Sequence, residues 1–147
     1  MNDPSSVEEW MKVARERGKD ADAMLPARAA SIGPIYMAGY AIECAIKGYM
    51  QQRRIRRPSS GREGHNLRGL WSQAHFRLSD LKDTAGTKSF FIKHWTTGFR
   101  YQTNCPPNTP NSDEAVRAAK EIVGWIQAQI NRLQARKNNR KRQNRRR

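Results

Sequence analysis

Apolar residues recur along most of the chain at the intervals of an α-helix. Between Ser6 and Leu25 the spacing is three or four residues, which predicts a first helix. Gly18 lies inside this pattern and indicates a close helix contact, because glycine is costly in a helix interior. We expect Pro26 to end the helix or to start a short turn. The apolar positions are Val7, Trp10, Met11, Ala14, Ala21, Met24 and Leu25.

A second helix is predicted after Ser31-Ile32-Gly33, with Pro34 in its first turn. Its sequence, IYMAGYAIECAIKGYMQQRR, is apolar on nearly all sides, which is typical of the central helix of a bundle. One polar stripe interrupts it, at spacings of four, three and four that share a face. Its members are Tyr36, Tyr40, Glu43 and Lys47. One interpretation of this stripe is a Glu43–Lys47 salt bridge at the helix edge.

Weaker patterns follow in the second half of the chain. Asn66 is a good N-cap for a third helix, and a short helical segment is expected around residues 78–84. A fourth helix is predicted from Lys88 to Tyr101. After a loop over residues 103–111, Ser112 is the expected N-cap of a last helix that carries apolar residues as far as Leu133.

These patterns predict an all-α protein, because strand signals are nearly absent. The expected architecture is an antiparallel helical bundle of four long helices plus one or two short ones. A chain of 147 residues corresponds to one domain. We assign residues 5–135 to the bundle and residues 136–147 to a basic, disordered tail.

Several classes of protein are excluded by the same sequence. The longest apolar stretch contains Glu43 and Lys47, which argues against a membrane span, and the acidic start lacks the apolar core of a signal peptide. Cys44 and Cys105 are too few for a disulfide framework, so we expect a reducing, cytoplasmic location. No cysteine or histidine spacing fits a metal site. We therefore expect neither a metal nor another cofactor.

The net charge of +15 is concentrated in residues 136–147, which read RKNNRKRQNRRR. This segment has eight basic residues and no acid, so we expect disorder or at most a frayed helical extension. Arginine outnumbers lysine, which favours nucleic acid as the partner because its guanidinium group binds phosphate through two hydrogen bonds. A solubilising tail is the alternative. The expected phosphate contacts are Arg140, Lys141, Arg142, Arg145, Arg146 and Arg147.

A second basic cluster lies where the second predicted helix gives way to a loop over Arg56–Gly64. Its members are Arg53, Arg54, Arg56 and Arg57. Compensation of the helix dipole, together with solvated loop charge, is one interpretation. Contact with phosphate is the other.

Motifs for nucleophilic catalysis and glycine-rich phosphate loops are absent from the sequence. What remains is a polar set within an otherwise apolar bundle. It consists of Tyr36, Tyr40, Glu43, Lys47, His65, Trp95, Arg100 and Tyr101. Cations beside aromatic rings can bind phosphate and stack a base. Alternatively, Glu43 pairs with Arg100 and only locks two helices together.

Three segments, YMAGYAIECAIKGYM, GHNLRGLW and HWTTGFRY, occur in an order that resembles the higher-eukaryote and prokaryote nucleotide-binding (HEPN) domain. The resemblance spans residues 5 to 135. It includes a central Glu and a following Lys in the second helix, a His-x-Leu helix start, and a late Trp followed by Arg-Tyr. The matching residues are Trp10, Ala14, Ala21, Glu43, Lys47, His65, Leu67, Trp95, Arg100 and Tyr101.

This resemblance implies a bundle of four to five helices with a nucleotide- or RNA-related role, commonly as a homodimer. It also implies a possible nucleotidyltransferase partner in toxin–antitoxin or defence systems. Many members are metal-independent endoribonucleases with an Arg, four to six residues and then a His. No His follows Arg100 at that distance, and the formal match is Arg68 with His75, seven apart on one predicted helix face.

We expect a non-catalytic domain that binds a nucleotide or RNA, with RNA favoured over DNA. The polar set would line or brace the site, and the basic clusters would add affinity for phosphate. One alternative is a ribonuclease toxin that uses Arg68 and His75 or a divergent pair. The other is an interaction subunit, dimeric or bound to a nucleotidyltransferase, without a nucleic-acid role.

Overall fold

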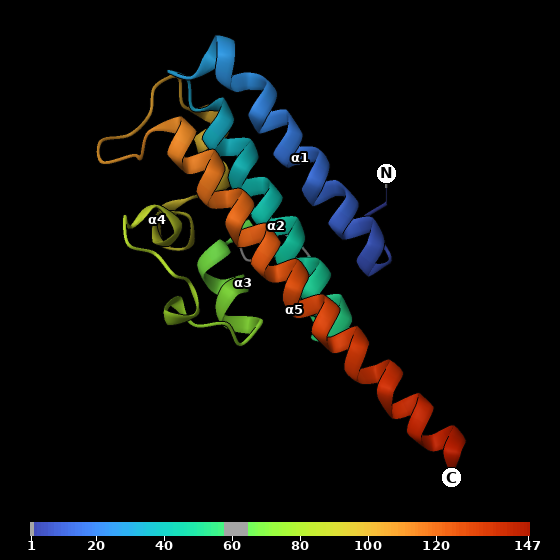
Figure 1. Ribbon diagram of the computed structural model, residues 1–147. Helices are drawn as coiled ribbons and strands as arrows, with labels where there is room; N and C mark the ends of the chain where they lie inside the picture. Colours follow the sequence, from blue (N-terminus) through green and yellow to red (C-terminus); the bar gives the residue numbers. More distant parts are fainter. Residues whose placement is uncertain (1, 58–64) are drawn as a thin grey trace.

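A computed structural model describes residues 2–57 and 65–147, and every regular element within them is helical (Figure 1). The long helices are α1 (Val7–Arg28), α2 (Gly33–Arg53) and α5 (Ser112–Arg146). The short ones are α3 (Leu67–Gln73) and α4 (Thr87–His94), with 3-10 turns at Leu78–Asp80 and Thr97–Tyr101. The all-α prediction is confirmed. Most of the loop expected over Arg56–Gly64 lies outside the described residues.

Helix α2 occupies the centre of the bundle, as its uniformly apolar sequence predicts. Residues 41–50 are buried without interruption. Helix α1 packs along one side of α2 and α5 along another, while α3 and α4 cover a further side (Figure 1). The core is therefore built around α2, against which α1, α5 and α3 pack, while α4 packs on α3 and α5.

The long helices run in two opposite directions. Helices α1 and α2 are antiparallel, but α5 runs parallel to α2 (Figure 1). The start of α5 lies by the start of α2, where Val116 and Ala38 line the same groove. Near the other end, the Gln134 Nε2 donates to the Gln52 Oε1 at 3.3 Å. The described elements between α2 and α5 are all short, so residues 2–57 and 65–147 contain three long helices instead of the four expected.

The helix predicted over Lys88–Tyr101 is interrupted at Trp95. This residue has φ −67° and ψ 134°, which ends α4, and a separate 3-10 turn follows. The Trp95 ring packs against Gly39 of α2, and its Nε1 donates to the Ile35 carbonyl at 3.1 Å. A tertiary contact thus overrides the helical pattern of the sequence.

Helix α5 begins one residue away from its predicted cap. The Asn111 side chain accepts a hydrogen bond from the Asp113 N–H at 2.8 Å and is the N-cap. Ser112, the expected cap, is buried, and its hydroxyl donates to the Ala29 carbonyl at 2.7 Å. The serine therefore fastens the start of α5 to the end of α1.

Two expectations for α1 were wrong. The helix continues through Pro26 to Arg28, because a proline near the end of a helix removes only one of its last hydrogen bonds. A Cβ added at Gly18 would meet no atom within 4 Å, so Gly18 does not mark a close contact in the described structure. Its absent side chain instead leaves open space beside α1.

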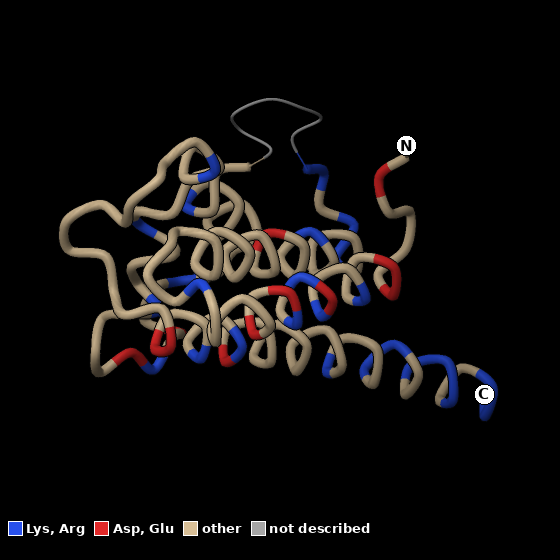
Figure 2. The backbone as a smooth tube through the Cα atoms, turned by 90° about the horizontal axis from the view of Figure 1, so that it is seen from above, with Lys and Arg blue, Asp and Glu red and all other residues tan. Residues whose placement is uncertain are grey.

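Residues 136–146, for which we expected disorder or at most a frayed helical extension, continue α5 as a helix that projects from the bundle (Figure 2). Their side chains are all exposed. Arginine, lysine and glutamine are good helix formers, and extending a packed helix avoids the cost of a new nucleus. The projecting end of α5 carries basic side chains without an interspersed acid (Figure 2).

Neither cysteine is paired in the described structure. Burial raises the pKa of the Cys44 thiol to about 12, so this cysteine is a core residue and not a nucleophile. Within the described residues, no three His, Cys, Asp or Glu side chains are grouped to hold a metal ion. None of the described helices has the length and apolarity to cross a bilayer.

The Asp83 side chain holds the start of α4. Its carboxylate accepts hydrogen bonds from the backbone N–H groups of Lys88 and Ser89, at 3.1 and 2.8 Å. Partial burial raises the pKa of Asp83, but hydrogen bonds from Ser89, Lys88 and Gly86 outweigh it and leave the pKa below its usual value. The ionised form is therefore preferred in the folded state.

We expect Asp83→Ala to lower the free energy of unfolding by about 1 kcal/mol at neutral pH, the usual loss for a helix cap. Because the folded pKa is depressed, the ionic stabilisation is present above the unfolded pKa of about 4 and is lost as pH falls through the folded pKa. Urea denaturation of both proteins at pH values from neutral to acidic measures the difference. If the difference in free energy of unfolding between the two proteins stays the same at acidic pH, the ionised Asp83 carboxylate does not contribute the stabilisation.

Candidate functional site

A buried carboxylate in the middle of α2 organises the polar set. Glu43 is 2% exposed, and its Oε2 lies 3.0 Å from the Nζ of Lys47. Lys47 is also buried, with its Nζ 5.6 Å from the Trp10 ring centre. The ion pair predicted from the spacing is confirmed, but it lies in the core and not at a helix edge. Both charges can be buried here because each has an opposite charge as its partner.

His65, which directly precedes the cap of α3, is the second partner of this carboxylate. Its Nδ1 lies 3.1 Å from Oε1 and 3.2 Å from Oε2 of Glu43. The expected pairing of Glu43 with Arg100 is therefore replaced by contacts to Lys47 and His65. Because a carboxylate only accepts hydrogen bonds, Nδ1 carries the proton in this contact, and in the neutral imidazole Nε2 is then an acceptor. The His65 side chain is 45% exposed and lines the groove described next.

A groove with a cavity volume of about 870 Å³ lies between the start of α3 and the segment that follows α4. We call it the α3–α4 groove. Three cationic side chains and a histidine line it: Arg68, Lys93, Arg100 and His65. No acidic side chain lines it within the described part of the chain. The groove therefore suits an anionic ligand.

Aromatic rings stand beside the Arg100 edge of this groove. The Arg100 guanidinium carbon lies 4.8 Å from the ring centre of Tyr101, which is 77% exposed. The Arg100 guanidinium donates to the Tyr101 oxygen and more weakly to the Tyr36 oxygen, and this hydrogen bonding raises the pKa of Arg100. Tyr36 stacks on Trp95 at 5.9 Å, but the Trp95 ring is 3% exposed. Tyr101 is thus the ring on which a nucleotide base could stack, while the buried Trp95 forms part of the groove wall.

The structure brings together only part of the predicted polar set. His65, Trp95 and Arg100 line the α3–α4 groove, whereas Glu43 reaches it only through His65. Tyr40 lies beside Tyr36 at 6.5 Å, and burial raises the pKa of its hydroxyl. Neither Tyr40 nor Lys47 lines the groove.

Sequence reasoning missed Lys93 and Asn66 as lining residues and assigned Arg68 to another site. Their closeness in the sequence to predicted site residues was the nearest signal for Lys93 and Asn66. Lys93 stands two residues before Trp95, and Asn66 follows His65 directly. Helix α4 and the start of α3 carry these residues to the groove beside Arg100.

The predicted pair of Arg68 and His75 does not share a helix face. Helix α3 ends at Gln73, and His75 lies beyond it with a φ of 64°. The seven-residue spacing therefore does not place these two side chains on one face of a helix. Arg68 lines the α3–α4 groove with His65, and His75 does not.

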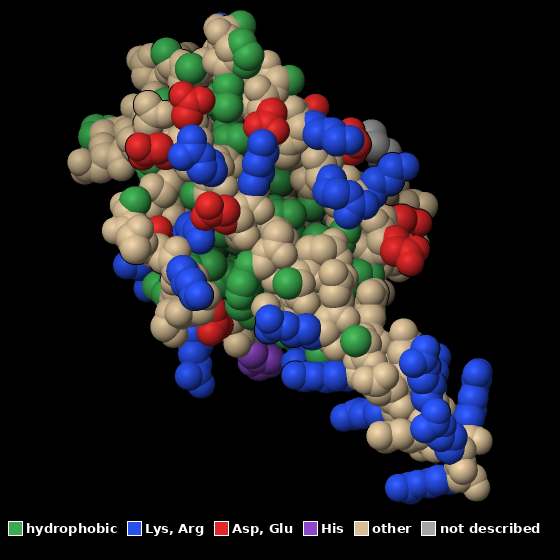
Figure 3. Space-filling model, viewed as in Figure 1, with side chains coloured by type: hydrophobic (Ala, Val, Ile, Leu, Met, Phe, Trp, Pro, Cys, Tyr) green, Lys and Arg blue, Asp and Glu red, His purple; other side chains and the backbone are tan. Residues whose placement is uncertain are grey.

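A second cavity, of about 550 Å³, lies between the end of α2 and the projecting part of α5. We call it the basic junction. Six cationic residues line it: Arg53, Arg54, Arg136, Lys137, Arg140 and Lys141. The two basic clusters predicted separately therefore meet at one place, because α5 runs parallel to α2. No acid follows Glu121 in the sequence, and the space-filling view shows only basic charge along this end (Figure 3).

Other members of the two basic clusters lie outside the junction. Arg57 stacks over the Trp10 ring at 4.6 Å and lies 3.5 Å from Asp3. Arg56 is exposed at the end of the described segment. Toward the end of the chain, the exposed arginines that do not line the junction are Arg142, Arg145, Arg146 and Arg147.

Comparison of the chain with family models, with curated proteins and with solved structures finds no match. Its function must therefore follow from its own residues. The α3–α4 groove offers cations, a carboxylate-held histidine and an exposed tyrosine. The basic junction offers six cations with no acid among its lining residues.

Proposed function

We propose that this protein is a HEPN-like domain that binds RNA, holding the phosphate backbone at the basic junction. The observation that carries the proposal is the convergence of Arg53 and Arg54 with four cations of α5 on one cavity. Each arginine or lysine that contacts a phosphate releases condensed counterions, so binding is strong at low salt and falls steeply as salt rises. The four arginines of the junction add hydrogen bonds directed at phosphate oxygens.

The α3–α4 groove supplies the nucleotide contacts of the proposed function. Arg68 and Lys93 are suited to phosphate, and the Arg100–Tyr101 pair offers a flat surface on which an unpaired base can stack. Stacking on a side chain needs a base that is not already inside a duplex. We therefore infer single-stranded RNA as the preferred ligand over duplex DNA.

A second candidate function, metal-independent RNA cleavage, is favoured by the contact between His65 and Glu43. With Nδ1 held by the carboxylate, Nε2 can accept the proton of a ribose 2′-hydroxyl as that oxygen attacks the adjacent phosphorus. Arg68 or Arg100 would stabilise the charge on the phosphate oxygens. The bond to the 5′-oxygen breaks and that oxygen takes a proton from water, which leaves a 2′,3′-cyclic phosphate and a 5′-hydroxyl end.

One gel experiment tests the binding proposal. Radiolabelled single-stranded RNA is incubated in EDTA with the wild type, with Arg53→Glu/Arg54→Glu, and with Lys12→Glu/Lys82→Glu. The two double variants change the net charge equally, but Lys12 and Lys82 lie outside both sites. We expect the junction variant to bind about tenfold or more weakly and the control to stay within about twofold, because local contacts dominate phosphate binding. Equal losses of RNA affinity in the two double variants would contradict phosphate binding at the basic junction.

The same gel separates the other functions. RNA that is shifted but intact supports a non-catalytic binding domain. Cleavage that is lost in His65→Ala and kept in His75→Ala would establish the second candidate. Absence of any shift at low salt would overturn RNA binding, and an interaction subunit, dimeric or bound to a nucleotidyltransferase, would then be the better proposal.

A further inference from the structure

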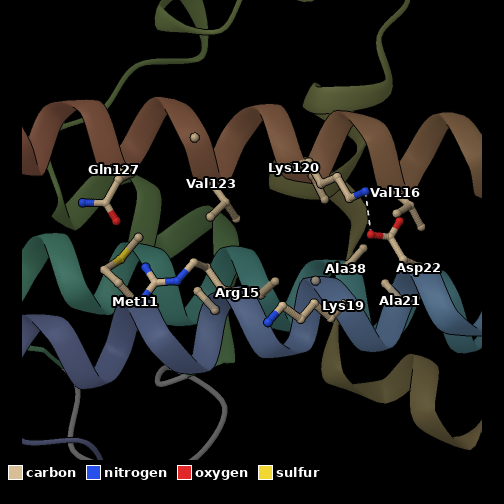
Figure 4. A pocket seen from close by; sticks show the side chains of 15 residues that line it. Met11, Arg15, Lys19, Ala21, Asp22, Ala38, Val116, Lys120, Val123 and Gln127 are labelled. Carbon is tan, nitrogen blue, oxygen red and sulfur yellow. Dashed lines mark ion pairs between the residues drawn. The ribbon is translucent and has the colours of Figure 1, made fainter.

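A third cavity, of about 400 Å³, lies on the α1 side of the bundle, away from both proposed RNA sites. Helices α1 and α5 form its walls and α2 its floor (Figure 4). The stretch of α1 that lines it runs from Met11 to Asp22, which at 1.5 Å per residue is about 16 Å. We call it the α1–α5 groove. It is a long apolar channel whose floor includes Ala38 and Ala41.

Two glycines face this groove, and packing within the described chain explains neither. A Cβ added at Gly18 of α1 or at Gly124 of α5 would meet no atom within 4 Å. At Gly48, by contrast, an added Cβ would lie 3.0 Å from the Met11 sulfur. Glycine within a helix costs about 1 kcal/mol relative to alanine. The two glycines leave the groove open to a molecule from outside.

An ion pair crosses the groove near one end. There Lys120 of α5 reaches Asp22 of α1, and their charged atoms lie 2.6 Å apart (Figure 4). A helix with side chains is about 10 Å across, so a helix laid along the whole groove would have to break this ion pair. A second copy of this chain would bring another net charge of +15 against the same cationic rim. An extended aliphatic chain fits the width and the apolar lining.

The rim of the groove provides a cation for the head group of such a chain. Lys120 is paired with Asp22, and Lys19 lies 3.1 Å from Glu16. Arg15 forms no ion pair with any residue that the structure describes, and its guanidinium lies beside Met11, away from the Lys120–Asp22 pair (Figure 4). An anionic head group beside Arg15 would give that charge a partner.

We propose that the α1–α5 groove binds a free, single-chain amphiphile with an anionic head group, such as a fatty acid. The aliphatic chain lies on Ala38 and Ala41 between the two glycines, and its carboxylate pairs with Arg15. The apolar chain leaves water, which drives binding, and the cation fixes its direction. This site is separate from the proposed RNA-binding surface and does not depend on it.

Isothermal titration of the full chain with sodium dodecanoate, below its micelle concentration, tests the proposal. We expect one saturable site. Gly18→Leu or Gly124→Leu fills the groove and should weaken binding by about tenfold or more. Ala23→Leu places the same leucine side chain on the exposed side of α1 and should change binding less than about twofold. Hexanoate should bind at least about thirtyfold more weakly, because fewer methylene groups are buried. Arg15→Gln should weaken binding of dodecanoate more than that of dodecanol.

Several results would overturn the proposal. Dodecanoate that does not bind, or that binds Gly18→Leu and Ala23→Leu equally well, would show that the groove is not its site. Vesicles of anionic phospholipid provide a further comparison, because a membrane carries the same chemistry. Vesicle binding that depends on Gly18 while free dodecanoate fails to bind would assign the groove to membrane lipid instead.

Discussion

Gly39→Ala is expected to lower the free energy of unfolding by about 3 kcal/mol, although it adds one methyl group to a helix. The added Cβ would lie 2.1 Å from two atoms of the Trp95 indole, far inside contact distance. The ring would have to leave its slot on α2, which also breaks the Nε1 hydrogen bond to Ile35. Urea denaturation followed by circular dichroism measures the loss.

Gly18→Ala is the matched control, because it makes the same chemical change within a helix where the new methyl group meets no atom within 4 Å. There we expect no loss and a gain of up to about 1 kcal/mol, from helix propensity alone. In a Trp95→Ala background the cost of Gly39→Ala should largely disappear, because the two sites are in contact. A cost that stays the same without the indole would contradict the proposed clash.

The Trp95 slot also shows what the sequence could not predict about the fold. The period of apolar residues was enough to place α1, α2 and the start of α5, because each buries one face or all of its surface. The aromatic spacing around Trp95 also has a helical period, so a continuous helix was predicted. What breaks it is the space above Gly39, and the sequence around residue 95 contains no sign of a glycine 56 positions away.

The candidate site was predicted to a similar degree. Glu43 and Lys47 could be paired from spacing alone, because i and i+4 are neighbours on any helix. The contact of His65 with Glu43 depends on where α3 packs, which no local pattern specifies. The basic clusters were each recognisable by composition. Their meeting requires α5 to run parallel to α2 and to pack beside it, and composition alone does not specify which helices pack together.

Removing residues 136–147 is expected to weaken binding of single-stranded RNA by about a hundredfold or more near 0.1 M salt. The segment carries eight of the 28 basic residues and contributes Arg136, Lys137, Arg140 and Lys141 to the basic junction. Each lost phosphate contact on a single strand reduces the slope of log affinity against log salt by about 0.7. Four lost contacts would therefore flatten the slope by about three. Fluorescence anisotropy over a series of salt concentrations measures both quantities.

Two further proteins separate charge from length and side-chain geometry. One replaces the eight basic residues of 136–147 with glutamine, and we expect it to behave like the truncated chain. The other replaces the six arginines with lysine, which keeps the charge, and we expect it to retain most of the salt dependence while losing some affinity. The free energy of unfolding should change little, because these side chains are exposed. A truncated protein that keeps the slope of the wild type would exclude this segment from RNA contact.

A phosphate site shared by α2 and α5 predicts a different result for combined variants than an independent basic tail does. If Arg53 and Arg54 hold the same phosphates as the cations of α5, the contacts form one site. Removing residues 136–147 from the Arg53→Glu/Arg54→Glu variant should then cost clearly less than removing them from the wild type, because neighbouring groups that share a partner are not additive. If α5 carried an independent arm, the two losses would add. Measured on one RNA at one salt concentration, additive losses would contradict a shared phosphate site between α2 and α5.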